Sequence, residues 1–104
     1  MLIIKQGDTH NAIQSQLTKN GDPIDLTDCE VFISVSDIVF EDKCVITDED
    51  QGKVAYPLSN ISDNAGFHNY EFIIKYKDGT KEIVPNSEFN KIRIVERIGD
   101  NATK

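Results

Sequence analysis

The clearest pattern in the chain is the stretch His68-Asn69-Tyr70-Glu71-Phe72-Ile73-Ile74-Lys75-Tyr76. After His68, its even positions carry aromatic or apolar side chains, and its odd positions are polar apart from Ile73. A period of two places alternate side chains on opposite faces of a β-strand, whereas a helix needs a period of 3.6 residues. The stretch therefore predicts a strand that turns one face toward a core.

The same alternation recurs in both directions from this stretch. It is clear at Cys29–Ser36, Val54–Leu58 and Ile92–Ile98, and weaker at Asn11–Thr18. Turn residues separate these runs, and no window of eleven or more residues fits the helical period. We predict an all-β fold, an immunoglobulin-like antiparallel β-sandwich of about seven to eight short strands.

The segments between the runs predict particular connections. Lys77-Asp78-Gly79-Thr80 predicts a hairpin, with Asp-Gly in a tight primed turn that needs positive φ. Asp48-Glu49-Asp50-Gln51-Gly52 predicts a second hairpin turn. Asn20-Gly21-Asp22-Pro23 predicts a turn before the short segment Ile24–Leu26, and Ser59–Gly66 is interpreted as a small, polar linker.

Length and charge limit the function classes. With 104 residues the chain is expected to form one domain over residues 1–98, followed by a polar tail over residues 99–104. Its 11 Lys and Arg against 18 Asp and Glu give a net charge of −7, which predicts no nucleic-acid partner. No apolar run approaches the roughly 20 residues of a membrane helix, and Met1–Asp8 turns polar too soon for a signal peptide. We expect no membrane partner, and synthesis in a cytoplasm.

The two cysteines, Cys29 and Cys44, are interpreted as free thiols because a cytoplasm is reducing, with a disulfide between them as the alternative. Two cysteines cannot form a structural zinc site alone, and His10 and His68 are too far apart in the sequence to complete one. We expect His10 to be solvated and His68 to lie partly buried at a strand end.

The sequence contains no catalytic motif, so we predict that the protein is not an enzyme and has no cofactor or metal. Two features leave an alternative open. Asp48 and Asp50 lie in an acidic turn that is either solvated or a weak metal site, although it lacks the EF-hand pattern. The aromatic residues of the main stretch and Phe67 form either part of the core or a stacking platform.

Several segments, taken in order, resemble the amino-terminal domain of phage baseplate upper proteins, the BppU-type domain. The match covers residues 5 to about 95, nearly the whole chain. The matching segments are Lys5–Thr9, Asn20–Thr27, Asp50–Tyr56, Gly66–Phe72, Asp78-Gly79, Val84–Asn86, Phe89 and Ile92–Ile94. One departure is Gly66-Phe67-His68, where the family has Gly-x-Tyr. This departure puts a tyrosine corner in doubt, and Tyr70 is expected to take over the packing of the missing tyrosine.

The resemblance implies a non-catalytic structural protein of a phage or prophage tail or baseplate, located in the virion. It implies protein–protein contacts with other tail or baseplate proteins, and a homo-oligomer is compatible with it. We expect a less polar surface strip near Lys5–Thr9 or at a sheet edge, with Gln6, Asp8 and Phe89 as candidate contact residues. The alternative function is a host-surface carbohydrate- or ligand-binding module, which the absence of tryptophan disfavours.

Overall fold

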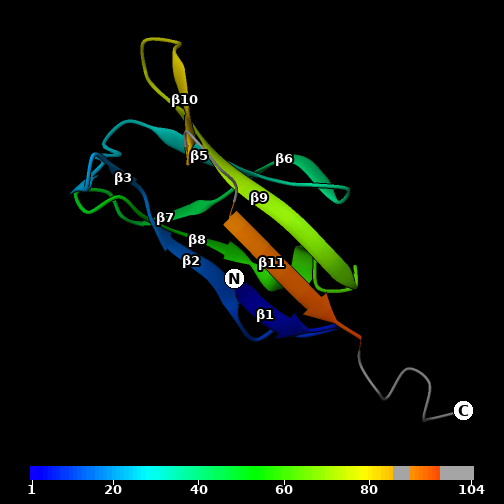
Figure 1. Cartoon of the computed structure of the whole chain (residues 1–104). Coiled ribbons are helices and arrows are strands. Elements are labelled where there is room, and N and C mark those ends of the chain that lie inside the picture. Colours follow the sequence, from blue (N-terminus) through cyan, green and yellow to red (C-terminus); the bar gives the residue numbers. More distant parts are fainter. Residues whose placement is uncertain (86–89, 97–104) are drawn as a thin grey trace, which may run out of the picture.

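The fold is known from a computed structural model, which describes residues 1–85 and 90–96. These residues form eleven β-strands, and their only helical segment is the short 3-10 helix η1, Leu58–Asn60 (Figure 1). The predicted all-β class is confirmed. No helix within the described residues is long and apolar enough to cross a membrane.

Six of the described strands form one sheet, here called sheet A. Its main order is β1–β11–β9–β5–β6, and β10 lies beside β11 along the same edge of the long strand β9. The bounds are Leu2–Lys5 for β1, Asn90–Val95 for β11, Gly66–Lys75 for β9, Glu30–Val35 for β5, Val39–Lys43 for β6 and Lys81–Val84 for β10.

Three further strands form sheet B, in the order β2–β8–β7, and β3 and β4 form a small separate hairpin. The bounds are Ala12–Gln16 for β2, Lys53–Pro57 for β8, Val45–Asp48 for β7, Thr18–Lys19 for β3 and Asp22–Pro23 for β4. Figure 1 shows sheet A lying over sheet B. The two layers are consistent with an immunoglobulin-like sandwich.

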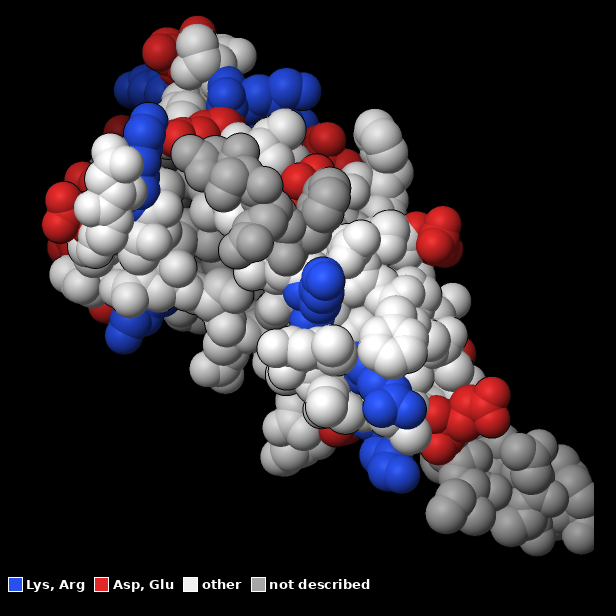
Figure 2. Space-filling model, viewed as in Figure 1, with Lys and Arg blue, Asp and Glu red and all other residues white. Residues whose placement is uncertain are grey.

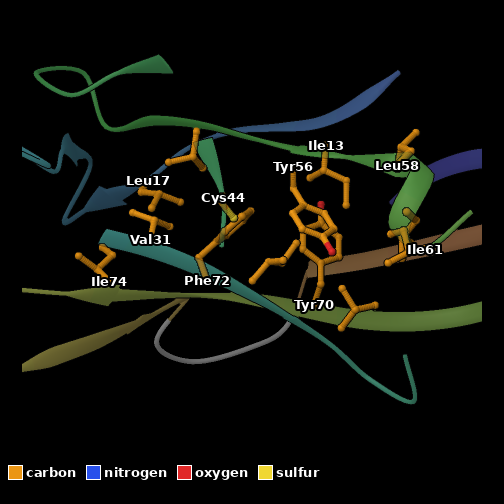
Figure 3. Close-up of a cluster of buried hydrophobic side chains, with 14 of the residues drawn as sticks. Ile13, Leu17, Val31, Cys44, Tyr56, Leu58, Ile61, Tyr70, Phe72 and Ile74 are labelled. Carbon is orange, nitrogen blue, oxygen red and sulfur yellow. The ribbon is translucent and has the colours of Figure 1, made fainter. Parts of the chain in front are cut away.

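The core lies between the two sheets and uses the faces that the alternation selects. Tyr56 of β8 and Tyr70 of β9 point toward each other from opposite layers (Figure 3). Tyr70 also packs edge-on against Phe72, with ring centroids 5.9 Å apart. Each large apolar side chain that is fully buried stabilises the fold by roughly 1.5–3 kcal/mol. Those with the least exposure include Ile13, Leu17, Leu26, Val31, Ile33, Tyr56, Leu58, Ile61, Phe72, Ile74, Ile92 and Ile94.

The structure differs in two details from the predicted sandwich, whose class is confirmed. The pairing of β1 with β11 is parallel, although every other pairing among the described strands is antiparallel. The described strands also exceed the predicted number, because β1, β3, β4 and β6 were not expected. These strands are two to five residues long, and some are rich in charge, so they lack a clear apolar alternation.

The turns also differ in detail from the prediction. The hairpin between β9 and β10 is confirmed, but its turn is not primed, because positive φ occurs at Gly79 and not at Asp78. Instead, Asn20 and Gly21 both have positive φ, 55° and 86°, in the turn between β3 and β4. This is the backbone geometry of a primed two-residue turn, which suits asparagine followed by glycine.

Two segments between strands contribute to the core. The segment interpreted as a polar linker carries Ile61, which is fully buried beside Leu58. The acidic turn before β8 ends at Gly52, which is buried between the backbones of Leu17 and Ile24. The segment around Ile61 and the acidic turn therefore pack against the rest of the domain as well as connecting strands.

Candidate interaction surface

The predicted contact residues Gln6 and Asp8 lie in the turn that follows edge strand β1. Gln6 Nε2 donates a hydrogen bond to the Asp63 carbonyl oxygen at 2.9 Å. The Asp8 carboxylate accepts a hydrogen bond from the side-chain amide of Asn11 at 3.0 Å. It also accepts from the backbone N–H groups of His10 (3.0 Å) and Asn11. The Asn11 amide, followed by the His10 N–H, lowers the pKa of the Asp8 carboxyl below its ordinary value of 3.8.

Asp8 therefore organises the turn as well as facing solvent. The third candidate, Phe89, lies outside the described residues. Whether these three residues form a contact surface stays a prediction.

The histidines lie where the sequence predicted. His10 is exposed, and His68 is half-buried near the start of β9. The His68 ring lies between two backbone carbonyl oxygens, with Nδ1 3.1 Å from Ser36 O and Nε2 3.0 Å from Asn64 O. These contacts tie β9 to the segments around Ser36 and Asn64, while Tyr70 supplies a buried ring.

The other candidate chemical groups are dispersed. The predicted free thiols are confirmed, with Cys29 half-buried and Cys44 buried. The acidic turn joins β7 to β8 as a solvated hairpin turn, as predicted, and Asp48 and Asp50 are exposed. Within residues 1–85 and 90–96, no three His, Cys, Asp or Glu side chains are grouped so as to hold a metal ion.

A hollow lies on the outer face of sheet B. Neutral polar side chains, including Gln14, Gln16 and Thr47, line it together with Lys53 and Ala55. Saccharide sites are built from aromatic as well as polar side chains, and no aromatic side chain is among the described residues that line this hollow. The hollow therefore does not favour the carbohydrate-binding alternative.

The outer face of sheet A carries exposed apolar residues. Ile3 of β1 is 61% exposed and Phe67 of β9 is 67% exposed. Arg93 of β11 lies between them in the register of the sheet, opposite both Ile3 and Phe67. The Arg93 guanidinium lies over the Phe67 ring, 5.2 Å from its centroid. These three side chains form one row across three neighbouring strands.

Two lysines flank this row. Lys5 follows Ile3 by two positions along β1, and Lys91 precedes Arg93 by two positions along β11, so they point to the same outer face. Figure 2 shows this part of the surface as mostly uncharged with basic residues in it, while acidic residues lie toward its margins. We call Ile3, Lys5, Phe67, Lys91 and Arg93 the outer strip.

Sequence reasoning expected a less polar strip near Lys5–Thr9 or at a sheet edge but did not name Ile3, Phe67, Lys91 or Arg93, because these residues lie on the face opposite to the core. One signal was present: Phe67 has the opposite parity to Tyr70 and Phe72, so the alternation that buries those two rings exposes Phe67. The hypothesis that all these aromatic residues belong to the core is therefore wrong for Phe67. Arg93 lies beside Phe67 through the antiparallel pairing of β11 with β9, and Ile3 joins the row through the parallel pairing of β1 with β11. The sequence predicts neither pairing.

Comparisons with known proteins agree with the fold. A family model described as the BppU N-terminal domain matches residues 2–93. Among solved structures, the chain is similar to the N-terminal domain of phage TP901-1 ORF48, with a TM-score of 0.69 and 22% sequence identity. The similarity covers 93% of this chain and 85% of that chain, and it shows a shared fold. No curated protein matches. The resemblance inferred from the sequence is confirmed.

Proposed function

Because the chain belongs to the BppU N-terminal domain family, we propose that it is a non-catalytic structural protein of a phage or prophage tail or baseplate. It acts through protein–protein contacts with other tail or baseplate proteins and resides in the virion after synthesis in the host cytoplasm. The observation that carries this proposal is the family match over residues 2–93. The structural similarity to a phage domain over 93% of the chain supports it.

The geometry of the polar side chains supports the non-catalytic part of the proposal. A general base must reach a substrate proton, which requires a ring nitrogen or carboxylate that is open to a ligand. Both ring nitrogens of His68 lie against backbone carbonyls, and the Asp8 carboxylate is engaged by its own turn. These groups hold loops in place and do not converge on a common point.

We also propose that residues 1–98 form one immunoglobulin-like domain and that residues 99–104 are a polar tail. The family match over residues 2–93 and the single core shared by both sheets support one domain. Limited proteolysis followed by mass measurement tests this boundary. A stable fragment ending near residue 98 is expected, and cleavage inside the sandwich under native conditions would contradict it.

Reconstitution tests the function. The chain is co-expressed with the tail proteins encoded beside its gene, with a tag on one component at a time. We expect a stable complex that survives size-exclusion chromatography, and the chain should be found in purified tails by mass spectrometry. Absence from tails together with no binding to any co-encoded tail protein would overturn the proposal.

The predicted contact residues need their own variant in the same assay. The triple variant Gln6→Ala, Asp8→Ala, Phe89→Ala is expected to weaken assembly. Because Asp8 organises the turn, the matched control is Asp8→Asn, whose side-chain oxygen still accepts from the His10 N–H. If the triple variant binds tail proteins as tightly as the unmodified chain, these three residues are not the contact surface.

A further inference from the structure

The outer strip combines two properties, exposed apolar side chains and a set of cations on the same face. Ile3 and Phe67 leave more than half of their surface in water on the outer face of sheet A. Ile83 and Phe40, which are also exposed, lie on other strands of sheet A. An exposed apolar row rimmed by polar residues marks a contact surface for another molecule.

The second property is the set of cations on the same face. Elsewhere among the described residues, Lys19, Lys43 and Lys75 each form an ion pair with a glutamate, whereas Lys53, Lys77 and Lys81 form none. No ion pair between described residues involves Lys5, Lys91 or Arg93. The chain has a net charge of −7, yet this face carries three cations that find no carboxylate among the described residues.

We propose that the outer strip is a docking face for a partner protein of the tail that presents carboxylates around an apolar contact. The proposal rests on the proposed function and adds the surface and the chemistry of the partner. The apolar row would bury against the partner's apolar side chains, while Lys5, Lys91 and Arg93 would receive its carboxylates. Arg93 is the central anchor, because a guanidinium stacked on an aromatic ring still offers its edge to a carboxylate.

A second copy of this chain is a poorer occupant. Two outer strips placed face to face would oppose three cations with three cations. In addition, two molecules that each carry a charge of −7 repel one another as they approach. A different protein with a local excess of Asp and Glu meets neither obstacle.

The experiment measures the dissociation constant between the purified chain and the co-encoded tail protein recovered in the complex above. Phe67→Ser is compared with Phe40→Ser, a phenylalanine that is 89% exposed but lies outside the outer strip. We expect Phe67→Ser to weaken binding by about tenfold or more and Phe40→Ser to change it less than about twofold. Circular dichroism confirms that each variant is folded. If Phe67→Ser does not fold, Arg93→Gln takes its place with the same expected loss.

The charge requirement is tested with variants of equal net charge. Lys5→Gln with Lys91→Gln is compared with Lys77→Gln with Lys81→Gln, which removes two lysines from the β9–β10 hairpin instead. The first pair should weaken binding at low salt and make it less dependent on salt concentration. The second pair of substitutions should leave the affinity and its dependence on salt concentration nearly unchanged, because Lys77 and Lys81 lie outside the outer strip.

The outcomes separate the two proposals. If the unmodified chain binds no tail protein, the proposed function fails, and this inference fails with it. If the chain binds but the variants of the outer strip bind equally well, only the docking face is wrong. If sedimentation shows that the chain dimerises and that Phe67→Ser yields monomers, the outer strip joins two copies, and the acidic partner is overturned.

Discussion

Gly52 has a backbone conformation and surroundings that other residues do not tolerate. Its φ is +66°, in the left-handed region that favours glycine. A Cβ atom there would lie 2.6 Å from the Leu17 carbonyl oxygen and 2.8 Å from the Ile24 carbonyl oxygen. Both contacts are with backbone atoms, which cannot move aside without shifting sheet B against the β3–β4 hairpin.

We therefore expect Gly52→Ala to lower the free energy of unfolding by about 2–4 kcal/mol, through backbone strain and overpacking. The matched control is Gly79→Ala, because Gly79 has φ of +90° but a Cβ atom there would meet nothing within 4 Å. In that variant only backbone strain should lower the free energy of unfolding, by about 1–2 kcal/mol. Thermal unfolding measures both changes, and equal losses would show that the close approach at Gly52 does not matter.

Tyr56 carries a hydrogen bond between the two layers. Its hydroxyl donates to the Asp42 carboxylate at 2.7 Å, and Asn60 Nδ2 donates to the hydroxyl at 3.3 Å. Burial, and then the hydrogen bond to Asp42, raise the pKa of Tyr56 from 10.0 to about 12. Because the folded-state pKa is the higher one, this contribution to stability is complete below pH 10 and is lost as the pH rises toward 12.

Tyr56→Phe is expected to cost about 1.5–3 kcal/mol at neutral pH, because the Asp42 carboxylate loses its donor. The loss of stability between pH 10 and 12 should also become shallower in this variant. Tyr70→Phe serves as the control, since no hydrogen bond of the Tyr70 hydroxyl to another described residue is present, and it should cost less. Urea titrations at several pH values measure both effects. An equal cost for the two variants would contradict a role for the Asp42 contact.

Strand β9 is the organising element of the larger sheet. It pairs with β5 along one edge, and β11 and β10 share the other edge. Its alternation was sufficient to predict the strand and its buried face, from Tyr70 through Ile74. The alternation could not show that Ile73, on the opposite face, is also buried, because that burial comes from the neighbouring strands, where Phe32 and Ile83 lie opposite Ile73.

Strand β10 is held to the β3–β4 hairpin through Glu82. The Glu82 carboxylate accepts a hydrogen bond from the Tyr76 hydroxyl at 2.7 Å and forms an ion pair with Lys19 at 3.1 Å. The Tyr76 hydroxyl, followed by Lys19, lowers the pKa of Glu82 below its ordinary value of 4.5. The stabilisation is therefore present above pH 4.5 and is lost as the pH falls through the lowered pKa.

Glu82→Gln is expected to lower the stability at neutral pH by about 1 kcal/mol, because the glutamine keeps an acceptor for Tyr76 but loses the charge that faces Lys19. Below pH 4.5 the variant should lose less stability than the unmodified chain. Glu49→Gln, in the exposed acidic turn, is the control that removes one carboxylate outside this contact. Chemical denaturation from about pH 7 to about pH 3 measures the difference in unfolding free energy. If Glu82→Gln and the unmodified chain lose stability equally as the pH falls, the proposed role of the Glu82 carboxylate is wrong.

At the scale of the whole molecule, the two thiols report how the domain opens. Cys44 is 4% exposed between the layers, and burial, followed by Asp42, raises the pKa of its thiol from 9.0 to about 12. Burial, and then Asp25, also raise the pKa of the half-buried Cys29 thiol. Only a thiolate reacts readily with a disulfide reagent, so Cys44 is protected both by burial and by its protonation.

We expect Cys29 to react slowly with Ellman's reagent at about pH 8 and Cys44 to react only when the domain unfolds. In Cys29→Ala, the rate of labelling should therefore follow global unfolding and rise with urea. Cys44→Ala is the control that reports Cys29 alone. Rapid labelling of Cys29→Ala in native buffer would show that the two layers separate more easily than this core implies.

The amino-acid sequence by itself determined the all-β class and the positions of β5, β8, β9 and β11, because alternation and turn chemistry are local properties. The family was indicated by the resemblance of its ordered motifs, which the family match confirms. It did not determine the parallel pairing of β1 with β11, since strand partners distant in sequence are selected by packing and hydrogen bonding in the folded chain. The burial of Ile61 in a segment interpreted as a linker has the same cause. Only the tertiary structure decided the outer strip, because it brought Ile3, Phe67 and Arg93, from three separate segments, onto one face.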